Sequence, residues 1–207
     1  ESDMYVLNVD TGKIVEGPID RCRYSPIAWL KGGSAFYYVR RIAPDLLPES
    51  ESHFHRRVYL HTLGADPHTD VLVFGAGMNL TNYYGVSVSR DGRWLEIESS
   101  EGTEPRNDLW IADLTASAPS SPSFELVQGD VDAQTSLTFG RDGRAYIFTD
   151  RDAPRGMLLV TTPGSWDPTS WRTLIPEAQD AVLASVTLLA GVRLAPDQLL
   201  VVHKPHG

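Results

Sequence analysis

The stretch Ser89-Arg90-Asp91-Gly92-Arg93-Trp94 lies between two runs of alternating apolar and polar residues. Asp-Gly in this position favours a type I′ hairpin turn, because that turn needs positive φ at both central residues and matches the strand twist. With Asp91 and Gly92 in the turn, the predicted cross-strand pairs are Val88 with Leu95, Val86 with Ile97 and Ser87 with Glu96. One face of this hairpin is therefore apolar and the other polar.

The same construction occurs at Gly32-Gly33 and at Asp142-Gly143. The predicted pairs are Trp29 with Phe36 and Ile27 with Tyr38 in the first hairpin, and Phe139 with Tyr146 and Leu137 with Phe148 in the last. Apolar pairs fall on the same rungs in all three hairpins, an agreement that fixes one common register. The chain therefore reads as a repeat.

The repeat has the length of a propeller blade. Its expected third strands contain Tyr5, Tyr59, Trp110 and Leu158, which are 54, 51 and 48 residues apart. A four-stranded antiparallel unit of about 50 residues is typical of β-propellers. We expect an all-β fold and one partial β-propeller domain over residues 1–207, with about four blades' worth of sequence. The expected parts are a blade remnant at 1–17, blades at about 24–74, 83–127 and 135–175, and an unfinished blade at 182–203.

Composition excludes several classes of protein. The net charge of -9 and the pI near 5.0 argue against nucleic acid as a partner, because phosphate binding needs clustered Lys and Arg. No apolar run reaches the roughly 18 residues of a membrane span. The single cysteine, Cys22, rules out an internal disulfide framework. It fits a reducing compartment, for which we expect the cytoplasm, and leaves an extracellular location as the alternative. The abrupt start at Glu1, without a secretory signal, suggests a segment of a longer protein.

A family resemblance rests on Asp91-Gly92-Arg93, on the run from Glu101 to Trp110, and on Ala112-Asp113-Leu114. Supporting stretches are Ser25 to Trp29 with Phe36-Tyr37-Tyr38, Val58 to Gly64, and Trp171 to Glu177. Together they resemble the propeller of the prolyl oligopeptidase family of serine peptidases. The resemblance implies a seven-bladed propeller over an α/β-hydrolase domain, whose active site it guards. The sequence contains no Gly-x-Ser-x-Gly motif, so the Ser, Asp and His triad and the hydrolase domain are expected outside these residues.

The resemblance also implies a function. The complete enzyme is expected to hydrolyse short peptides after proline, while this region gates and positions the substrate. Its expected partners are a peptide and the hydrolase domain of the same protein, with no nucleic acid, membrane or cofactor. The alternatives are a non-enzymatic propeller that binds proteins, since fold does not fix function, and a peptidase with basic-residue or dipeptide specificity. An isolated segment is expected to self-associate through its unpaired blade edges.

No catalytic residue is expected within this chain, but the resemblance implies substrate contacts. Family side chains from the inner rim of the propeller reach toward the peptide, and they map onto Tyr83 and Thr103, with Phe36 a weaker third. Family members can carry Met and Cys at the first two places, so Tyr83 and Thr103 depart from that pattern. The alternative is an ordinary rim tyrosine and a loop threonine.

Three other features suggest chemistry less strongly. His53 and His55 could ligate a metal, but no third ligand has suitable spacing, so surface histidines and no metal site are favoured. Cys22 could be a reactive thiol, although a small residue packed between blades is the simpler interpretation. The alternating Trp and Tyr residues are most simply packing between blades.

The arginine pairs Arg40-Arg41 and Arg56-Arg57 could bind a peptide carboxylate or a phosphate. We favour a different reading, in which they are strand-end charges. In that reading their partners are Asp45, Glu49 and Glu51.

Overall fold

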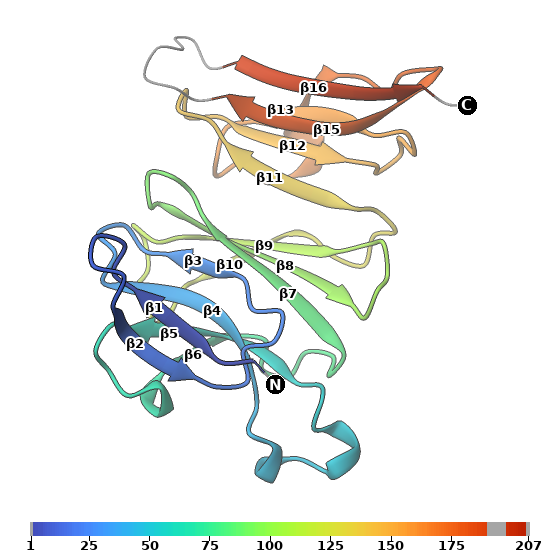
Figure 1. Ribbon diagram of the computed structural model, residues 1–207. Coiled ribbons are helices and arrows are strands. Elements are labelled where there is room, and N and C mark those ends of the chain that lie inside the picture. Colours follow the sequence, from blue (N-terminus) through green and yellow to red (C-terminus); the bar gives the residue numbers. More distant parts are fainter. Residues whose placement is uncertain (1, 190–197, 206–207) are drawn as a thin grey trace. The chain divides into compact units, whose positions relative to one another are not determined.

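The computed structural model describes residues 2–189 and 198–205. Within them the chain forms three four-stranded sheets and two two-stranded sheets (Figure 1). In every sheet, strands that follow one another in sequence are neighbours. No helix among the described residues is long and apolar enough to cross a membrane. The expected all-β class is confirmed, with the four-stranded antiparallel sheets of a propeller.

The strands of the first sheet are β3 (Ile27–Trp29), β4 (Ala35–Arg41), β5 (Arg56–Thr62) and β6 (Val71–Phe74). Those of the second are β7 (Asn82–Val88), β8 (Trp94–Glu101), β9 (Asp108–Asp113) and β10 (Phe124–Gln128). Those of the third are β11 (Thr135–Phe139), β12 (Ala145–Thr149), β13 (Met157–Thr161) and β14 (Arg172–Ile175). Short 3₁₀ turns, η1 to η4, lie at Pro44–Leu46, Glu49–Glu51, Pro67–Thr69 and Pro168–Ser170.

The two-stranded sheets pair β1 (Met4–Leu7) with β2 (Ile14–Ile19), and β15 (Ala181–Leu189) with β16 (Gln198–Pro205). The strand expected from Val182 to Val192 thus begins one residue earlier, and its residues 190–192 lie outside the described residues. The long connection expected at 42–53 contains η1 and η2.

The hairpin at Asp91-Gly92 has the predicted register, with Val88 opposite Leu95 and Val86 opposite Ile97. Its turn differs from the prediction. Only Gly92 has positive φ, at 81°, and the type I′ turn is therefore wrong. Instead, residues 90–93 form a four-residue loop that is held by the Asp91 carboxylate, which accepts hydrogen bonds from the hydroxyl and amide groups of its neighbours. A side-chain cap of this kind replaces the second positive φ.

The first hairpin also has its predicted register, with Trp29 opposite Phe36 and Ile27 opposite Tyr38. In this hairpin a glycine stands at the loop position equivalent to Gly92, namely Gly33, with φ of 70°. The predicted apolar face of the first two hairpins is therefore correct.

The predicted register of the third hairpin is wrong by one residue. The backbone amide of Gly140 donates to the carbonyl of Arg144 (2.8 Å), which leaves only residues 141–143 in the loop. In consequence Leu137 faces Ile147, and Tyr146 faces Thr138. The sequence could not reveal this shift, because Gly140 joins the strand ladder where the other hairpins have a larger residue.

The chain divides into two compact units, Glu1–Thr103 with Ile111–Glu125, and Glu104–Trp110 with Leu126–Gly207. In the first unit, Ile19, Cys22, Phe36 and Tyr38 form a buried cluster between the β1–β2 hairpin and the first sheet. Aromatic side chains also join the first sheet to the second, because the Phe74 ring lies edge-on to Tyr84 (5.8 Å) and Phe124 (5.0 Å). Tyr84 is thus packed between sheets as expected, whereas Tyr24, Trp29 and Tyr83 are exposed.

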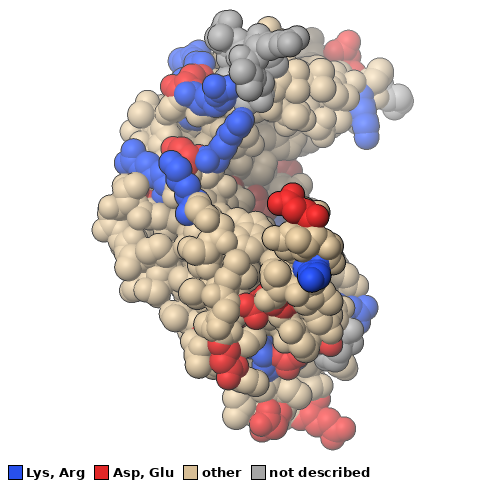
Figure 2. Space-filling view, turned by 60° about the vertical axis from the view of Figure 1, so that its left-hand side comes forward, with Lys and Arg blue, Asp and Glu red and all other residues tan. Residues whose placement is uncertain are grey.

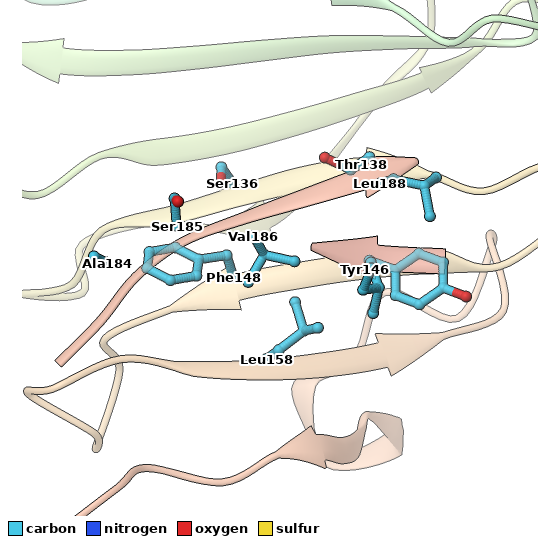
Figure 3. Close-up of a pocket in the computed structure, with 10 residues that line it drawn as sticks. Ser136, Thr138, Tyr146, Phe148, Leu158, Ala184, Ser185, Val186 and Leu188 are labelled. Carbon is cyan, nitrogen blue, oxygen red and sulfur yellow. The ribbon is translucent and has the colours of Figure 1, made fainter. Parts of the chain in front are cut away.

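In the second unit, β15 and β16 pack on the third sheet. Their buried cluster contains Tyr146, Leu158, Val160 and Leu183. A pocket of about 220 Å³ lies in the same seam (Figure 3). Its lining comes from β11, β12, β13, β15 and β16 and carries no charged side chain.

Candidate functional site

Tyr83 and Thr103 lie at the same end of the second sheet. Tyr83 is opposite Ser100 in the β7–β8 ladder, and Thr103 follows β8 by two residues. The β7–β8 ladder extends to the pair Asn82 and Glu101. The side-chain amide of Asn82 also donates to the Ser99 hydroxyl (2.9 Å) across the two strands.

We call this end of the first two sheets the loop end. It carries the connections 42–55, 75–81 and 102–107, whereas the turn end carries the loops 30–34 and 89–93. Because antiparallel strands alternate in direction, residues before β3, after β4 and at the start of β5 also lie at the loop end. Segments far apart in sequence therefore meet beside Tyr83.

Tyr83 is 37% exposed, and one face of its ring is already covered. The guanidinium carbon of Arg56 lies 3.8 Å from the ring centroid, a close cation–π contact. The ring of Tyr24 is a second neighbour of Tyr83, with its centroid 6.2 Å away and its plane tilted by 57°. Arg23 lies over Tyr24 in turn, with its guanidinium carbon 5.0 Å from that ring centroid. We call these four side chains, Arg23, Tyr24, Tyr83 and Arg56, the arginine–tyrosine row.

Sequence reasoning missed Tyr24, which it assigned to a regular strand. Tyr24 is 64% exposed and has φ of 61°, as does His55, at 58°, directly before Arg56. Positive φ is strained for residues with bulky side chains and persists only where the surroundings enforce it. The signal in the sequence is the tyrosine just before Ser25-Pro26, at the start of a blade.

Phe36 has a different position from the other two predicted residues. It stands near the start of β4, toward the turn end, and its side chain is fully buried. Its ring packs against Trp29 (4.8 Å) and His61 (5.2 Å). The structure thus places Phe36 in the core, where it offers no surface to a peptide, while Thr103 is exposed.

The arginine pairs are buried at the loop end, with each of the four side chains 5–6% exposed. Arg40 pairs with Asp20 and donates to the Pro67 carbonyl (2.9 Å). Arg41 donates to the Ser52 carbonyl (3.1 Å). Of the acids expected as partners, Glu51 binds His55 (2.6 Å), and Arg40 uses Asp20. The expected pairing is therefore wrong for Arg40.

The histidines 53 and 55 have separate partners, Arg41 (3.3 Å) and Glu51 (2.6 Å). Within residues 2–189 and 198–205, no group of three His, Cys, Asp or Glu side chains could hold a metal ion.

Cys22 is 7% exposed and donates to the Asp20 carbonyl (3.2 Å). Burial raises the pKa of its thiol to about 12, so it is not a thiolate nucleophile at neutral pH. The packed interpretation of Cys22 is confirmed.

A buried polar network near the turn end was also not predicted from the sequence. His61 is fully buried, and its Nδ1 lies 2.8 Å from Asp70, whose second oxygen accepts from the Tyr38 hydroxyl (2.6 Å). The His61 Nε2 lies 3.5 Å from Glu16 on β2. This network joins the β1–β2 hairpin to the first sheet and is structural.

The charged side chains visible in Figure 2 form small separate groups on a largely uncharged surface. This distribution fits the acidic composition of the chain, with its net charge of -9.

Comparison with known proteins identifies relatives of one kind. The chain is 27% identical over 179 residues to a prolyl endopeptidase of Elizabethkingia meningoseptica, covering 84% of this chain and 24% of that protein. It is 27% identical over 165 residues to the dual function macrocyclase-peptidase POPB of Galerina marginata, covering 79% of this chain and 22% of that protein. The chain thus spans about a quarter of the length of these relatives.

Solved structures agree. A structure from a study of two prolyl endopeptidases and their inter-domain dynamics is 25% identical, with a TM-score of 0.80 over 96% of this chain and 28% of that one. Prolyl oligopeptidase B from Galerina marginata, bound to a 25mer macrocyclization substrate, has the same fold, with 22% identity and a TM-score of 0.77 over 95% of this chain and 27% of that one. The family model described as "Prolyl oligopeptidase, N-terminal beta-propeller domain" matches residues 1–195. The chain therefore belongs to the prolyl oligopeptidase family, as an N-terminal β-propeller domain.

Proposed function

We propose that this chain is the substrate-gating propeller of a longer serine peptidase that hydrolyses short peptides after proline. The observation that carries the proposal is the family match over residues 1–195, together with relatives that are prolyl endopeptidases. The partner of the propeller is then an α/β-hydrolase domain of the same protein. The blades proposed at 24–74, 83–127 and 135–175 are three of its seven.

The residues present assign catalysis to the hydrolase domain and substrate contact to the propeller, a division of roles between the two domains. The sequence has no Gly-x-Ser-x-Gly motif, so the nucleophile, the base and the oxyanion donors of acyl transfer belong to the hydrolase domain. The loop end of the first two sheets faces that domain. Tyr83 contacts the peptide through its uncovered ring face, Tyr24 extends this aromatic surface, and Thr103 contacts the peptide from the neighbouring loop.

The proposed compartment is the cytoplasm. Cys22, the only cysteine, is a free and buried thiol, which suits a reducing environment.

The test compares the isolated chain with the full-length protein, using a chromogenic prolyl peptide and a serine-directed phosphonate. The full-length protein should release product and form a stoichiometric adduct, whereas the isolated chain should do neither. Absence of product and adduct in the full-length protein would overturn the peptidase and favour the protein-binding propeller. An adduct on a serine of the isolated chain would overturn the division of roles.

A further inference from the structure

Arg56 is a buried cation for which the chain supplies no anion. Its side chain is 5% exposed, and among the described residues no carboxylate forms an ion pair with it. Its Nε–H group is buried and has no hydrogen-bond acceptor. A buried, charged donor without a partner costs free energy, so such groups are rare unless a ligand completes them.

The surroundings of Arg56 reinforce this imbalance. Burial, together with the positive charges of Arg41 and Arg23, lowers the pKa of Arg56, while the Tyr83 phenol is the group that acts in the opposite sense. The carboxylate of Asp20 serves both Arg21 and Arg40. Arg56 thus lies among the positive charges of Arg41 and Arg23 and has no carboxylate counterion among the described residues.

The row is also open to a ligand at one side. Arg23 and Tyr24 are exposed, and Arg23 forms no ion pair among residues 2–189 and 198–205. The side chains run from exposed Arg23 through the two tyrosine rings to buried Arg56. An anion that enters beside Tyr83 meets the guanidinium of Arg56, which stacks on that ring, and Arg23 adds a second positive charge beyond Tyr24. Guanidinium groups bind carboxylates with strong, charge-assisted hydrogen bonds.

We propose that the arginine–tyrosine row binds a carboxylate of a peptide, with Arg56 as the specificity-determining residue. This inference rests on the proposed function in taking peptides as the ligands. The carboxylate comes from an acidic side chain or from the peptide's C-terminus. The protein therefore prefers peptides that carry a free carboxylate to blocked, neutral peptides of the same size.

The test measures binding to the full-length protein by calorimetry at low ionic strength, with three proline-free tetrapeptides. The first has a central glutamate and both ends blocked, the second has glutamine there and a free C-terminal carboxylate, and the third has glutamine and both ends blocked. At least one of the carboxylate peptides should bind about tenfold more tightly than the third, and the tighter of the two identifies the source of the carboxylate.

Arg56→Gln should abolish this preference. Arg23→Gln, a surface change that leaves the core intact, should reduce it about twofold to threefold and decides the question if the first variant fails to fold. Arg93→Gln removes the same charge at the turn end and should retain the preference. Equal binding of all three peptides to the unaltered protein, or an undiminished preference in both row variants, would overturn the inference.

Cleavage of a prolyl peptide is measured separately in the same preparations. Carboxylate binding that depends on Arg56, in a protein that cleaves no prolyl peptide, would refute the proposed function and keep this inference. Cleavage of a prolyl peptide, without any preference for the carboxylate peptides, would refute this inference and keep the proposed function.

Discussion

The two ends of the second sheet treat their arginines differently. At the turn end, Arg93 is half exposed and donates two hydrogen bonds to Asp113, of 3.0 and 2.7 Å. At the loop end, Arg56 is buried against Tyr83 and has no carboxylate partner among the described residues. Arg93 thus has its counterion within the chain, while Arg56 has none among the described residues.

The backbone differs in the same way. The loop 89–93 places its one positive φ at a glycine, Gly92, whereas the loop end forces Tyr24 and His55 into that region. Strain of this kind is commonly kept where a binding site needs a defined geometry. This difference between the two ends supports the proposal that the loop end contacts the substrate.

The largest effect is expected for Phe36→Ala, which tests whether Phe36 belongs to the core and not to the loop end. Removing a fully buried phenylalanine should lower the free energy of unfolding by about 3–5 kcal/mol. Urea unfolding of the purified protein measures this. Val9→Ala, at a 94% exposed position, is the control and should change stability by less than about 0.5 kcal/mol. If Phe36→Ala lost little unfolding free energy but had a raised KM, Phe36 would instead belong to the binding surface.

A second change probes how tightly the turn end is packed. Gly92→Ala places a Cβ 2.7 Å from the Lys31 Cβ, in addition to the strain of φ at 81°. Gly143→Ala is the matched control, because its φ of 76° is similar but its Cβ meets nothing within 4 Å. Gly143→Ala should cost about 1–2 kcal/mol of unfolding free energy, and Gly92→Ala more. If chemical denaturation showed equal losses of unfolding free energy in the two variants, Lys31 in the neighbouring hairpin would move aside at little cost.

A third change addresses the loop end. Tyr83→Ala should raise KM for prolyl peptides longer than a dipeptide about fivefold to tenfold, because one aromatic contact contributes on the order of 1 kcal/mol. The effect should fall on KM more than on kcat, since the contact is present in ground state and transition state alike. Thr103→Ala should have a weaker effect, and the distant Ser121→Ala almost none. Steady-state kinetics that show a loss confined to kcat would contradict the proposed contact.

The smallest effect concerns acid stability at the turn end. Hydrogen bonds from Arg93 and Thr115 lower the pKa of Asp113 from 3.8 to about 2. A carboxyl whose pKa is lower in the folded state stabilises that state above its unfolded pKa, and the benefit disappears as pH falls from about 4 toward 2. Asp113→Asn should therefore show a smaller drop in Tm between pH 5 and pH 2 than the unaltered protein. Identical drops in a pair of thermal scans would mean that this ion pair is not linked to folding.

Much of the fold could be predicted because alternation and spacing are local properties. The registers at Gly32-Gly33 and Asp91-Gly92 followed from apolar pairs alone. The register at Asp142-Gly143 did not, because Gly140 has no side chain to show which face it occupies and the loop is one residue shorter.

Less of the candidate site could be predicted, because its contacts join distant segments. Tyr83 and Thr103 share one end of a hairpin, as their spacing indicated. The position of Tyr24 could not be predicted, because its positive φ departs from the backbone conformation of a strand. The stacking of Arg56 on Tyr83 joins residues 27 positions apart and leaves no local pattern.

The central claim is that the loop end, and not the turn end, meets the substrate. Hydrogen exchange of the full-length protein with and without a bound prolyl peptide inhibitor tests it directly, since exchange reports local protection. The account predicts slower exchange on binding at residues 82–84 and 102–104, with no change at 89–93. Protection at 89–93, or none at either end, would contradict it.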